Sequence, residues 1–332
     1  MLRHLLAIAV ILTVPTGCDN VAWGGIDVTV ETPASDPEAV DDAAAAAAVD
    51  ETPPTPTGPL LMAGTREGST VSLAPVGMLV DDQLRPLPDP SDSIAYRAVA
   101  NELRSGTEWV LFASGVRVGG ATATGTVTDP VACGPGPGVI LTAVPELLPA
   151  ATATERFLAL PASEANDSPY EAYVPLDHNY NQRVASLSLG AAAVPRVGAT
   201  WPQGGMLPTR RDMQAFRPQD AERTSIAASF VIGDGLDTSA PSPGAYSLFL
   251  IAEERPSGFE ETFVWHRSAE EGKAAPRLFQ HLDWDEDGTD EALLEVFGNG
   301  MRGWVALERA GSERWEVSYR SACPHTTGPA GG

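Results

Sequence analysis

Basic residues are scarce in this chain of 332 residues. Lysine and arginine together number 21, against 44 aspartate and glutamate residues, and the formal net charge is −23. A protein that binds nucleic acid or docks on anionic lipid needs a basic surface. The composition therefore argues against both functions. It suits an exported protein or a cation-binding protein, and an ordinary acidic surface explains it equally well.

Recognisable catalytic motifs are also lacking. The five histidines include no H-E-x-x-H pair, and the chain contains no G-x-S-x-G, P-loop or dinucleotide-binding fingerprint. We therefore expect a protein that works by binding or scaffolding and is not an enzyme. The alternative is a hydrolase whose site is assembled from residues far apart in the sequence.

Long hydrophobic segments are rare, and the clearest lies at the amino terminus. Leu5–Val14 follows the positive charge of Arg3 and is ten residues long. Such a segment is too short for a stable transmembrane helix, but it suits the core of a signal peptide. The sequence therefore predicts an exported protein.

The hydrophobic segment ends in Pro15, Thr16, Gly17 and Cys18. This stretch resembles the lipobox of bacterial lipoproteins. The resemblance implies that residues 1–17 are a signal peptide and that Cys18 is lipidated, so that the protein is anchored to a membrane of the cell envelope. The alternative is an ordinary cleaved signal peptide with an incidental cysteine.

Cysteine is limited to three residues. If Cys18 carries lipid, Cys133 and Cys323 remain. An exported compartment permits a disulfide between them, which would tie an early region to the end of the chain. Two free thiols are the alternative.

Composition and strand-like segments divide the chain into regions. Short Val, Leu and Thr runs among 32 glycines and 29 prolines favour a mainly β fold of antiparallel meanders with a few short helices. The arrangement expected is either two β-rich lobes or a partial irregular propeller. The predicted regions after the signal peptide are a disordered Ala/Pro/Asp-rich tether (18–58), a β-rich lobe (59–150), an irregular connection (151–243), a β meander (244–322) and a flexible tail (323–332).

Local patterns predict several individual elements. Ser114 and Gly115 lie between two strand-like runs and predict a hairpin turn. Apolar spacing after Asp92 predicts a short helix up to Leu103. Within the connection, RVASLSLG resembles a strand, and PTRRDMQAF suggests a helix that Pro208 opens.

An acidic loop, DWDEDGTDE, interrupts the predicted meander. Six of its nine residues are carboxylates, and a glycine stands at the sixth position. Alternating carboxylates present oxygens to one point when such a loop curls, and a hard cation then offsets their repulsion. We expect a structural Ca²⁺ site formed by the side chains of Asp283, Asp285, Asp287 and Glu291 and the carbonyl of Thr289.

The spacing distinguishes this loop from other acidic loops. It resembles the calcium loop of FG-GAP and VCBS-type β repeats, D-x-D-x-D-G-x-x-[DE] followed by a strand. An EF-hand would require a glutamate at the twelfth position, where Leu294 stands. Glu286 and Asp290 are expected to point outward or to support the ligands from behind. The alternative to a metal site is a solvated acidic turn.

A tyrosine-rich segment, SPYEAYVPLDHNYNQ, offers a second candidate site. Tyr170, Tyr173 and Tyr180 stand there among aspartate and asparagine residues. Such a loop could bind a glycan or a peptide, and local packing is the alternative. The partners expected are thus a membrane through the lipid and an envelope protein or glycan.

Overall fold

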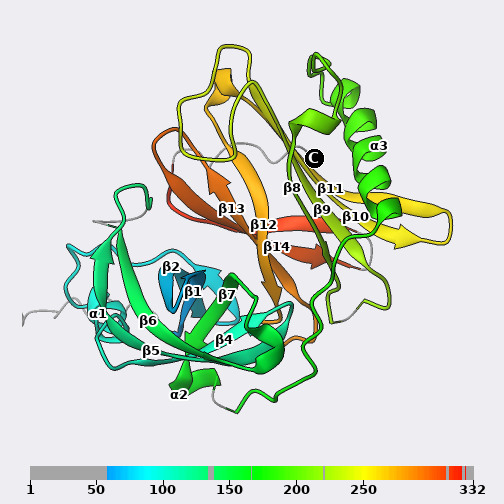
Figure 1. The fold of residues 1–332 in the computed structure, drawn as a ribbon. Coiled ribbons are helices and arrows are strands. Elements are labelled where there is room, and N and C mark those ends of the chain that lie inside the picture. The colour runs from blue at the N-terminus through cyan, green and yellow to red at the C-terminus, as the bar shows by residue number, and fades with distance from the viewer. Residues whose placement is uncertain are drawn as a thin grey trace, which may run out of the picture. The chain divides into compact units, whose positions relative to one another are not determined.

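The structure is a computed structural model, and it describes residues 58–133, 138–165, 167–219, 221–311, 314–323 and 326. The predicted signal peptide, the lipidation site Cys18 and nearly all of the predicted tether lie outside these residues. The described part is mainly β with antiparallel sheets, which confirms the predicted fold class (Figure 1).

The first part of the fold is a sheet that closes on itself. Its strand order is β1-β7-β4-β5-β6-β2-β3, and β1 also pairs with β2, so that six strands form a closed barrel and β3 is appended. All of these pairings are antiparallel. The elements are β1 (Leu60–Glu67), β2 (Thr70–Val80), β3 (Gln83–Arg85), α1 (Tyr96–Glu102), β4 (Glu108–Ala113), β5 (Val116–Thr128), β6 (Val139–Leu147), β7 (Arg156–Pro161) and α2 (Ala162–Ala165).

Period-two alternation gives each barrel strand an inner and an outer apolar face. Leu60 and Met62 of β1 belong to the core inside the barrel with Trp109 and Phe157, whereas Leu61 belongs to a second core outside it. The barrel therefore needs a partner to cover its outer face.

Two four-stranded meanders supply the remaining sheets. One has the order β12-β13-β14-β15 and the other β11-β10-β9-β8. Their strands are β8 (Arg210–Phe216), β9 (Ser225–Ile232), β10 (Tyr246–Arg255), β11 (Gly258–Ser268), β12 (Ala275–Leu282), β13 (Glu291–Phe297), β14 (Arg302–Ala310) and β15 (Arg314–Arg320). The predicted single meander over 244–322 is thus divided, because β10 pairs with β9 on one side and β11 on the other.

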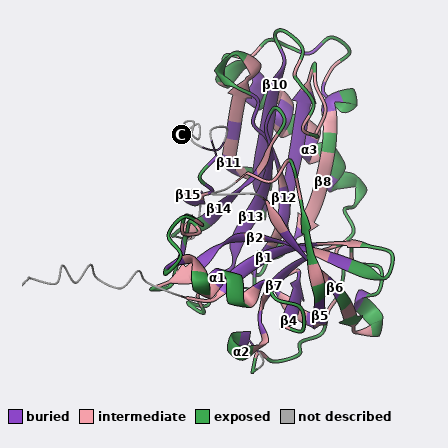
Figure 2. Cartoon of the chain, turned by 90° about the vertical axis from the view of Figure 1, so that its left-hand side faces the viewer, coloured by how far each residue is buried: buried purple, intermediate pink, exposed green. Residues whose placement is uncertain are grey.

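The β12–β15 sheet is the middle layer. Phe279 and Trp304 on one of its faces pack with the outer core of the barrel. Leu294 and Val305 on its other face pack with Phe249 of the neighbouring sheet. Every residue of β13 is buried, and Figure 2 shows the strand in the buried colour.

Helix α3 (Tyr180–Arg196) packs on the far face of the β8–β11 sheet (Figure 1). Asn179 caps it: its side chain accepts from the Gln182 backbone N–H at 3.0 Å, and the Gln182 side chain accepts from the Asn179 N–H at 2.7 Å. Gly190 allows close approach, because a Cβ there would lie 2.8 Å from Cζ of Phe230.

The connection 151–243 differs most from the sequence prediction. It is not irregular: β7 completes the barrel, and α3, β8 and β9 belong to the second half of the fold. The predicted strand RVASLSLG is the body of α3, where the capping box outweighs the strand-like alternation. The predicted helix after Pro208 is β8, because pairing with β9 outweighs the local helix signal.

Other local predictions are confirmed. Ser114 and Gly115 form the β4–β5 turn with φ of 51° and 77°. Asp92 accepts from the backbone N–H of Ile94 and Ala95 just before α1.

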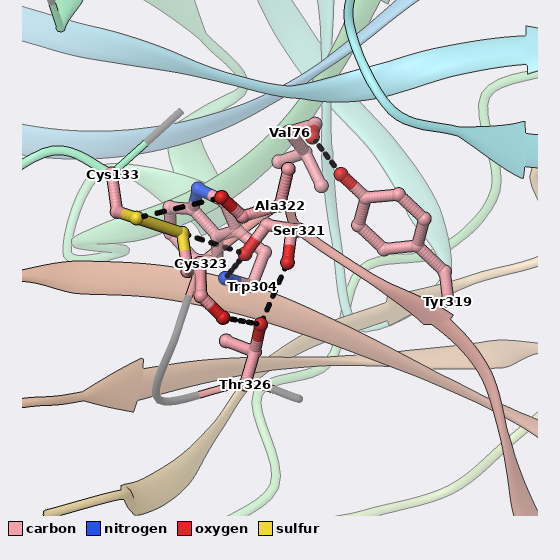
Figure 3. Close-up of a disulfide and its surroundings, with 8 residues drawn as sticks. All are labelled: Val76, Cys133, Trp304, Tyr319, Ser321, Ala322, Cys323 and Thr326. Atoms are coloured by element: carbon pink, nitrogen blue, oxygen red, sulfur yellow. Dashed lines mark hydrogen bonds between the residues drawn. A yellow bond between two sulfur atoms is a disulfide. The ribbon is translucent and has the colours of Figure 1, made fainter. Parts of the chain in front are cut away.

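A disulfide joins Cys133, after β5, to Cys323, after β15 (Figure 3). Their Cα atoms lie 5.8 Å apart, and 190 residues separate them in sequence. In the same region the Tyr319 hydroxyl donates to the Val76 carbonyl at 2.5 Å. These contacts attach the barrel to the end of the middle sheet.

Candidate metal centre

The acidic loop joins β12 to β13, and its backbone curls around the carboxylates. Glu286 and Gly288 have φ of 61° and 89°, in the left-handed region that permits a sharp turn. The Gly288 N–H donates to Asp283 Oδ2 at 2.9 Å, and the Asp287 N–H donates to Asp285 Oδ1 at 3.2 Å. Backbone donors thus fix the orientation of the side chains.

This curl brings three of the predicted ligands together. Asp283, Asp285 and Asp287 each offer one oxygen, and these oxygens lie within 4.8 Å of one another. Oxygens that share one Ca²⁺ at about 2.4 Å lie at most about 4.8 Å apart, so the spacing fits a common ion. Oδ1 of Asp283 is buried without a hydrogen-bond partner among the described residues.

Glu291, the fourth predicted carboxylate, begins β13 and is 5% exposed. Its Oε2 accepts a hydrogen bond from the Trp284 N–H at 3.1 Å. Burial, followed by the charges of Asp285, Asp283 and Asp287, raises the pKa of Glu291 to about 9. A carboxyl in this position needs either a proton or a nearby cation.

The pKa values of two loop aspartates, Asp283 and Asp285, are also raised. Burial is the largest cause that raises the pKa of Asp283 and of Asp285, and neighbouring carboxylates add to it. The three converging aspartates offer carboxylate oxygens alone, which suits Ca²⁺ better than Mg²⁺, since Mg²⁺ keeps several waters. The residues present therefore fit a calcium ion.

Strands flank the loop on both sides, as the FG-GAP-type resemblance implies and an EF-hand would not permit. Leu294, at the twelfth position, is fully buried in β13. Thr289 lies inside the loop, and its N–H donates to Asp287 Oδ1 at 2.8 Å.

Asp290 is not directed outward. Its side chain is fully buried, and Oδ2 lies 2.5 Å from Nδ1 of His281 and 3.2 Å from the backbone N of Gln219. Gln219 in turn donates from Nε2 to the Gly115 carbonyl at 2.8 Å. His281 is only nine residues from Asp290 in the sequence, but the contact with Gln219 spans 71 residues, and no local pattern could predict it.

A cavity of about 430 Å³ adjoins the acidic loop. Asp283 and Glu286 line it from the loop, Gly115 and Arg117 line it from the barrel, and the segment before the tyrosines contributes Ser168. The loop thus lies where the barrel meets the meanders, a common position for ligand sites.

The three tyrosines do not converge. Tyr170 is exposed, with the Arg117 guanidinium 4.2 Å from its ring centroid. Tyr173 packs against the barrel core, and its hydroxyl lies 2.8 Å from Thr154 Oγ1. Tyr180 is exposed at the start of α3.

No helix in the described part of the chain is both long enough and apolar enough to cross a membrane. Comparisons with protein-family models, with curated proteins and with solved structures find no match to this chain.

Proposed function

We propose that the protein is a calcium-stabilised, lipid-anchored protein of the bacterial cell envelope that acts by binding or scaffolding. The observation that carries the calcium part is the convergence of three aspartates beside buried Glu291. No arginine, lysine or histidine among the described residues forms an ion pair with Asp283, Asp285, Asp287 or Glu291. A bound Ca²⁺ supplies the missing positive charge.

The position of the loop supports a structural role for the ion. Next to the metal ligands, the Gly115 N–H of the barrel hairpin donates to the His281 carbonyl at 3.1 Å, and Ser114 N–H donates to Gln280 Oε1 at 2.9 Å. An ion that orders the loop therefore also orders the junction between barrel and middle sheet.

Thermal unfolding of the chain in EDTA and in millimolar Ca²⁺ tests this proposal. Saturation at 100 times Kd stabilises a folded protein by about 2.7 kcal/mol, a rise in Tm of roughly 5–10 °C for a body of this size. Asp285→Ala is expected to abolish the rise. Glu286→Asn is the matched control, because it removes a charge from the same loop at a residue whose positive φ asparagine tolerates. No shift, or an equal shift in Asp285→Ala, would overturn the proposal.

The anchoring part rests on the lipobox-like end of the hydrophobic segment at Cys18. Two acyl chains hold a protein on a membrane, because each buried CH₂ contributes about 0.8 kcal/mol. Expression in bacteria with radiolabelled palmitate is expected to label the chain and place it in the membrane fraction. Cys18→Ser should lose both the label and the membrane association. If the wild type carried no label and stayed in the soluble fraction, the anchoring part would be wrong, and the protein would be an ordinary secreted protein.

A second candidate function, glycan or peptide binding, is favoured by the cavity beside the loop. Ser168, Pro169 and Glu171 of the tyrosine-rich segment line it together with the loop residues Asp283 and Glu286. A glycan array and a peptide library, each probed in Ca²⁺ and in EDTA, test this function.

The test variant for that second function is Tyr170→Ala, because Tyr170 is exposed and its replacement should leave the thermal unfolding midpoint Tm unchanged. Tyr173→Ala is the less informative choice, since Tyr173 packs against the barrel and its removal should lower the melt. An absence of hits in both libraries would rule this function out.

A further inference from the structure

A groove of about 650 Å³ lies where the edges of the two four-stranded sheets meet, and it is separate from the cavity beside the acidic loop. β11 lines it with Glu261–Val264, β15 lines it with Arg314–Val317, and Arg196 and Val197 at the end of α3 complete the lining. Figure 2 shows β11 and β15 next to each other on one side of the molecule. None of these residues belongs to the proposed calcium site.

Both strands that line the groove are edge strands. In the described part of the chain, β11 pairs only with β10, and β15 pairs only with β14. The outer edge of each strand therefore presents backbone N–H and C=O groups with which another strand can pair. Such an edge is where a strand of a second molecule is added to a sheet.

The apolar side chains of the groove belong to the core between the two sheets. Phe263 and Trp315 are 7% and 3% exposed, and both are members of that core. Val317 packs against the same core and is partly exposed. The core between the sheets thus reaches the surface at this edge, where a second molecule can cover it.

The charges of the groove balance, although the whole chain has a formal net charge of −23. The lining contains two arginines, Arg196 and Arg314, and two glutamates, Glu261 and Glu316. Arg196 pairs with Glu261 at 2.5 Å within the same molecule. Two copies of such an acidic chain repel each other, and a region without net charge opposes their contact least.

Arg314 and Glu316, the other two charged residues of the groove, complement each other across a two-fold axis. Both are exposed, and they share one face of β15 because they are two residues apart. Neither forms an ion pair with another described residue. When two β15 strands pair antiparallel with Trp315 on the axis, Arg314 of each copy lies opposite Glu316 of the other. A two-fold interface requires a self-complementary surface of this kind.

We propose that this groove is the interface of a two-fold dimer, in which β15 pairs with β15 of a second copy of the chain. The pairing joins the β12–β15 sheets of the two copies into one continuous sheet. Because the two-fold axis of an antiparallel strand pair is perpendicular to the sheet, the β11 edges of the two copies also face each other. The exposed ends of the two inter-sheet cores then cover one another.

Size-exclusion chromatography with light scattering, which separates protein mass from detergent mass, tests the proposal on the full chain. The wild type is expected to have the mass of two chains and to dissociate on dilution. Arg314→Glu and Glu316→Arg should each weaken the dimer by about 10-fold or more, because each places like charges opposite one another. A wild type that is monomeric at every concentration would overturn the proposal and leave the edge to a partner of another kind.

Arg97→Glu is the matched control for these charge reversals. It makes the same change at an exposed residue of α1 that does not line the groove, and it should leave the dimer intact. Arg314 and Glu316 are exposed as well, so their replacement should leave the fold intact. A dimer that Arg314→Glu leaves unchanged, or that Arg97→Glu weakens equally, would contradict the proposed interface.

A mixture of the Arg314→Glu and Glu316→Arg chains distinguishes this interface from any other. Each variant repels itself, whereas the mixed pair places glutamates opposite arginines on both sides of the axis. We expect the mixture to recover the dimer, and the double variant that exchanges the two residues to recover it too. A mixture that stays monomeric would show that these residues do not face each other across the interface, and the proposal would be wrong.

Discussion

Strand β13 carries two buried carboxylates, Glu291 and Glu295, and they differ in the charges that surround them. Glu295 is 1% exposed, and Arg277 and Arg302 approach it at 2.5 and 3.1 Å. Glu291, on the same strand, is 5% exposed but has three aspartates as its charged neighbours. Two arginines provide the counter-charge for Glu295, whereas we propose that a bound ion provides it for Glu291.

The stability of β13 at Glu295 comes from the protein alone, whereas its stability at Glu291 depends on solution conditions. The arginine pairs form whenever the protein folds, whereas the acidic end of β13 is stable only with a proton or a cation present. If the acidic loop binds Ca²⁺ as we propose, the junction between barrel and middle sheet responds to Ca²⁺ at the Glu291 end of β13 and not at Glu295.

Among single substitutions, the largest effect is expected from Glu295→Gln. It leaves Arg277 and Arg302 without their shared buried carboxylate, although Asp129 still pairs with Arg302 at 2.6 Å. We expect a loss of about 3 kcal/mol, at the low end for a broken buried pair because both arginines are partly exposed. Urea denaturation should show the same loss in Ca²⁺ and in EDTA. A loss that depends on Ca²⁺ would contradict the separation of the two ends.

Glu291→Gln should change the Ca²⁺ dependence of stability, which Glu295→Gln should leave unchanged. The neutral amide removes a ligand and needs no proton to be buried. We expect the Ca²⁺-dependent stabilisation of about 2–3 kcal/mol to disappear, while stability in EDTA at neutral pH rises, because the variant no longer has to hold a proton that the unfolded wild type releases. Paired denaturation curves with and without Ca²⁺ measure both effects, and a Ca²⁺ response equal to that of the wild type would remove Glu291 from the site.

A pH series sharpens the comparison further. The pKa of Glu291 is raised from 4.5 to about 9, so without a cation the folded state holds a proton that the unfolded state releases. The stabilising effect is therefore complete below about pH 4.5 and is lost as pH rises toward 9, by up to about 1.4 kcal/mol per pH unit.

That pH series is measured in EDTA. Glu291→Gln should be less sensitive to pH between 5 and 9 than the wild type. In Ca²⁺ the dependence reverses, because binding displaces the proton and affinity rises with pH. Identical slopes for wild type and variant would show that Glu291 is not the titrating group.

The smallest effect is expected from Thr289→Ala. Only the backbone carbonyl of Thr289 is a proposed ligand, and its N–H bond to Asp287 is retained. Ca²⁺ affinity and stability should change by less than about 0.5 kcal/mol. Loss of Ca²⁺ binding in this variant would mean that the hydroxyl, and not the carbonyl, takes part.

Local features were predictable from the sequence, and long-range pairing was not. The curl of the acidic loop follows from residue spacing within nine positions, and the Ser114–Gly115 turn follows from two residues. Closure of the barrel depends on β7 pairing with β1, 97 residues away in the Met62–Ala159 pair, and no local pattern predicts such a contact.

The same limit applies to the site. Asp290 follows the loop ligands in sequence, and its burial depends on His281, Gln219 and Gly115 from three separate elements. The exchange of helix and strand in α3 and β8 has the same cause, since packing and pairing outweighed weak local preference.

Isothermal titration of Ca²⁺ into EDTA-stripped protein tests the central claim most directly. We predict one Ca²⁺ per chain, bound with similar affinity by the wild type and Glu286→Asn, and not bound by Asp285→Ala. An absence of binding in the wild type, or equal binding in Asp285→Ala, would contradict the claim that the acidic end of β13 is completed by a calcium ion.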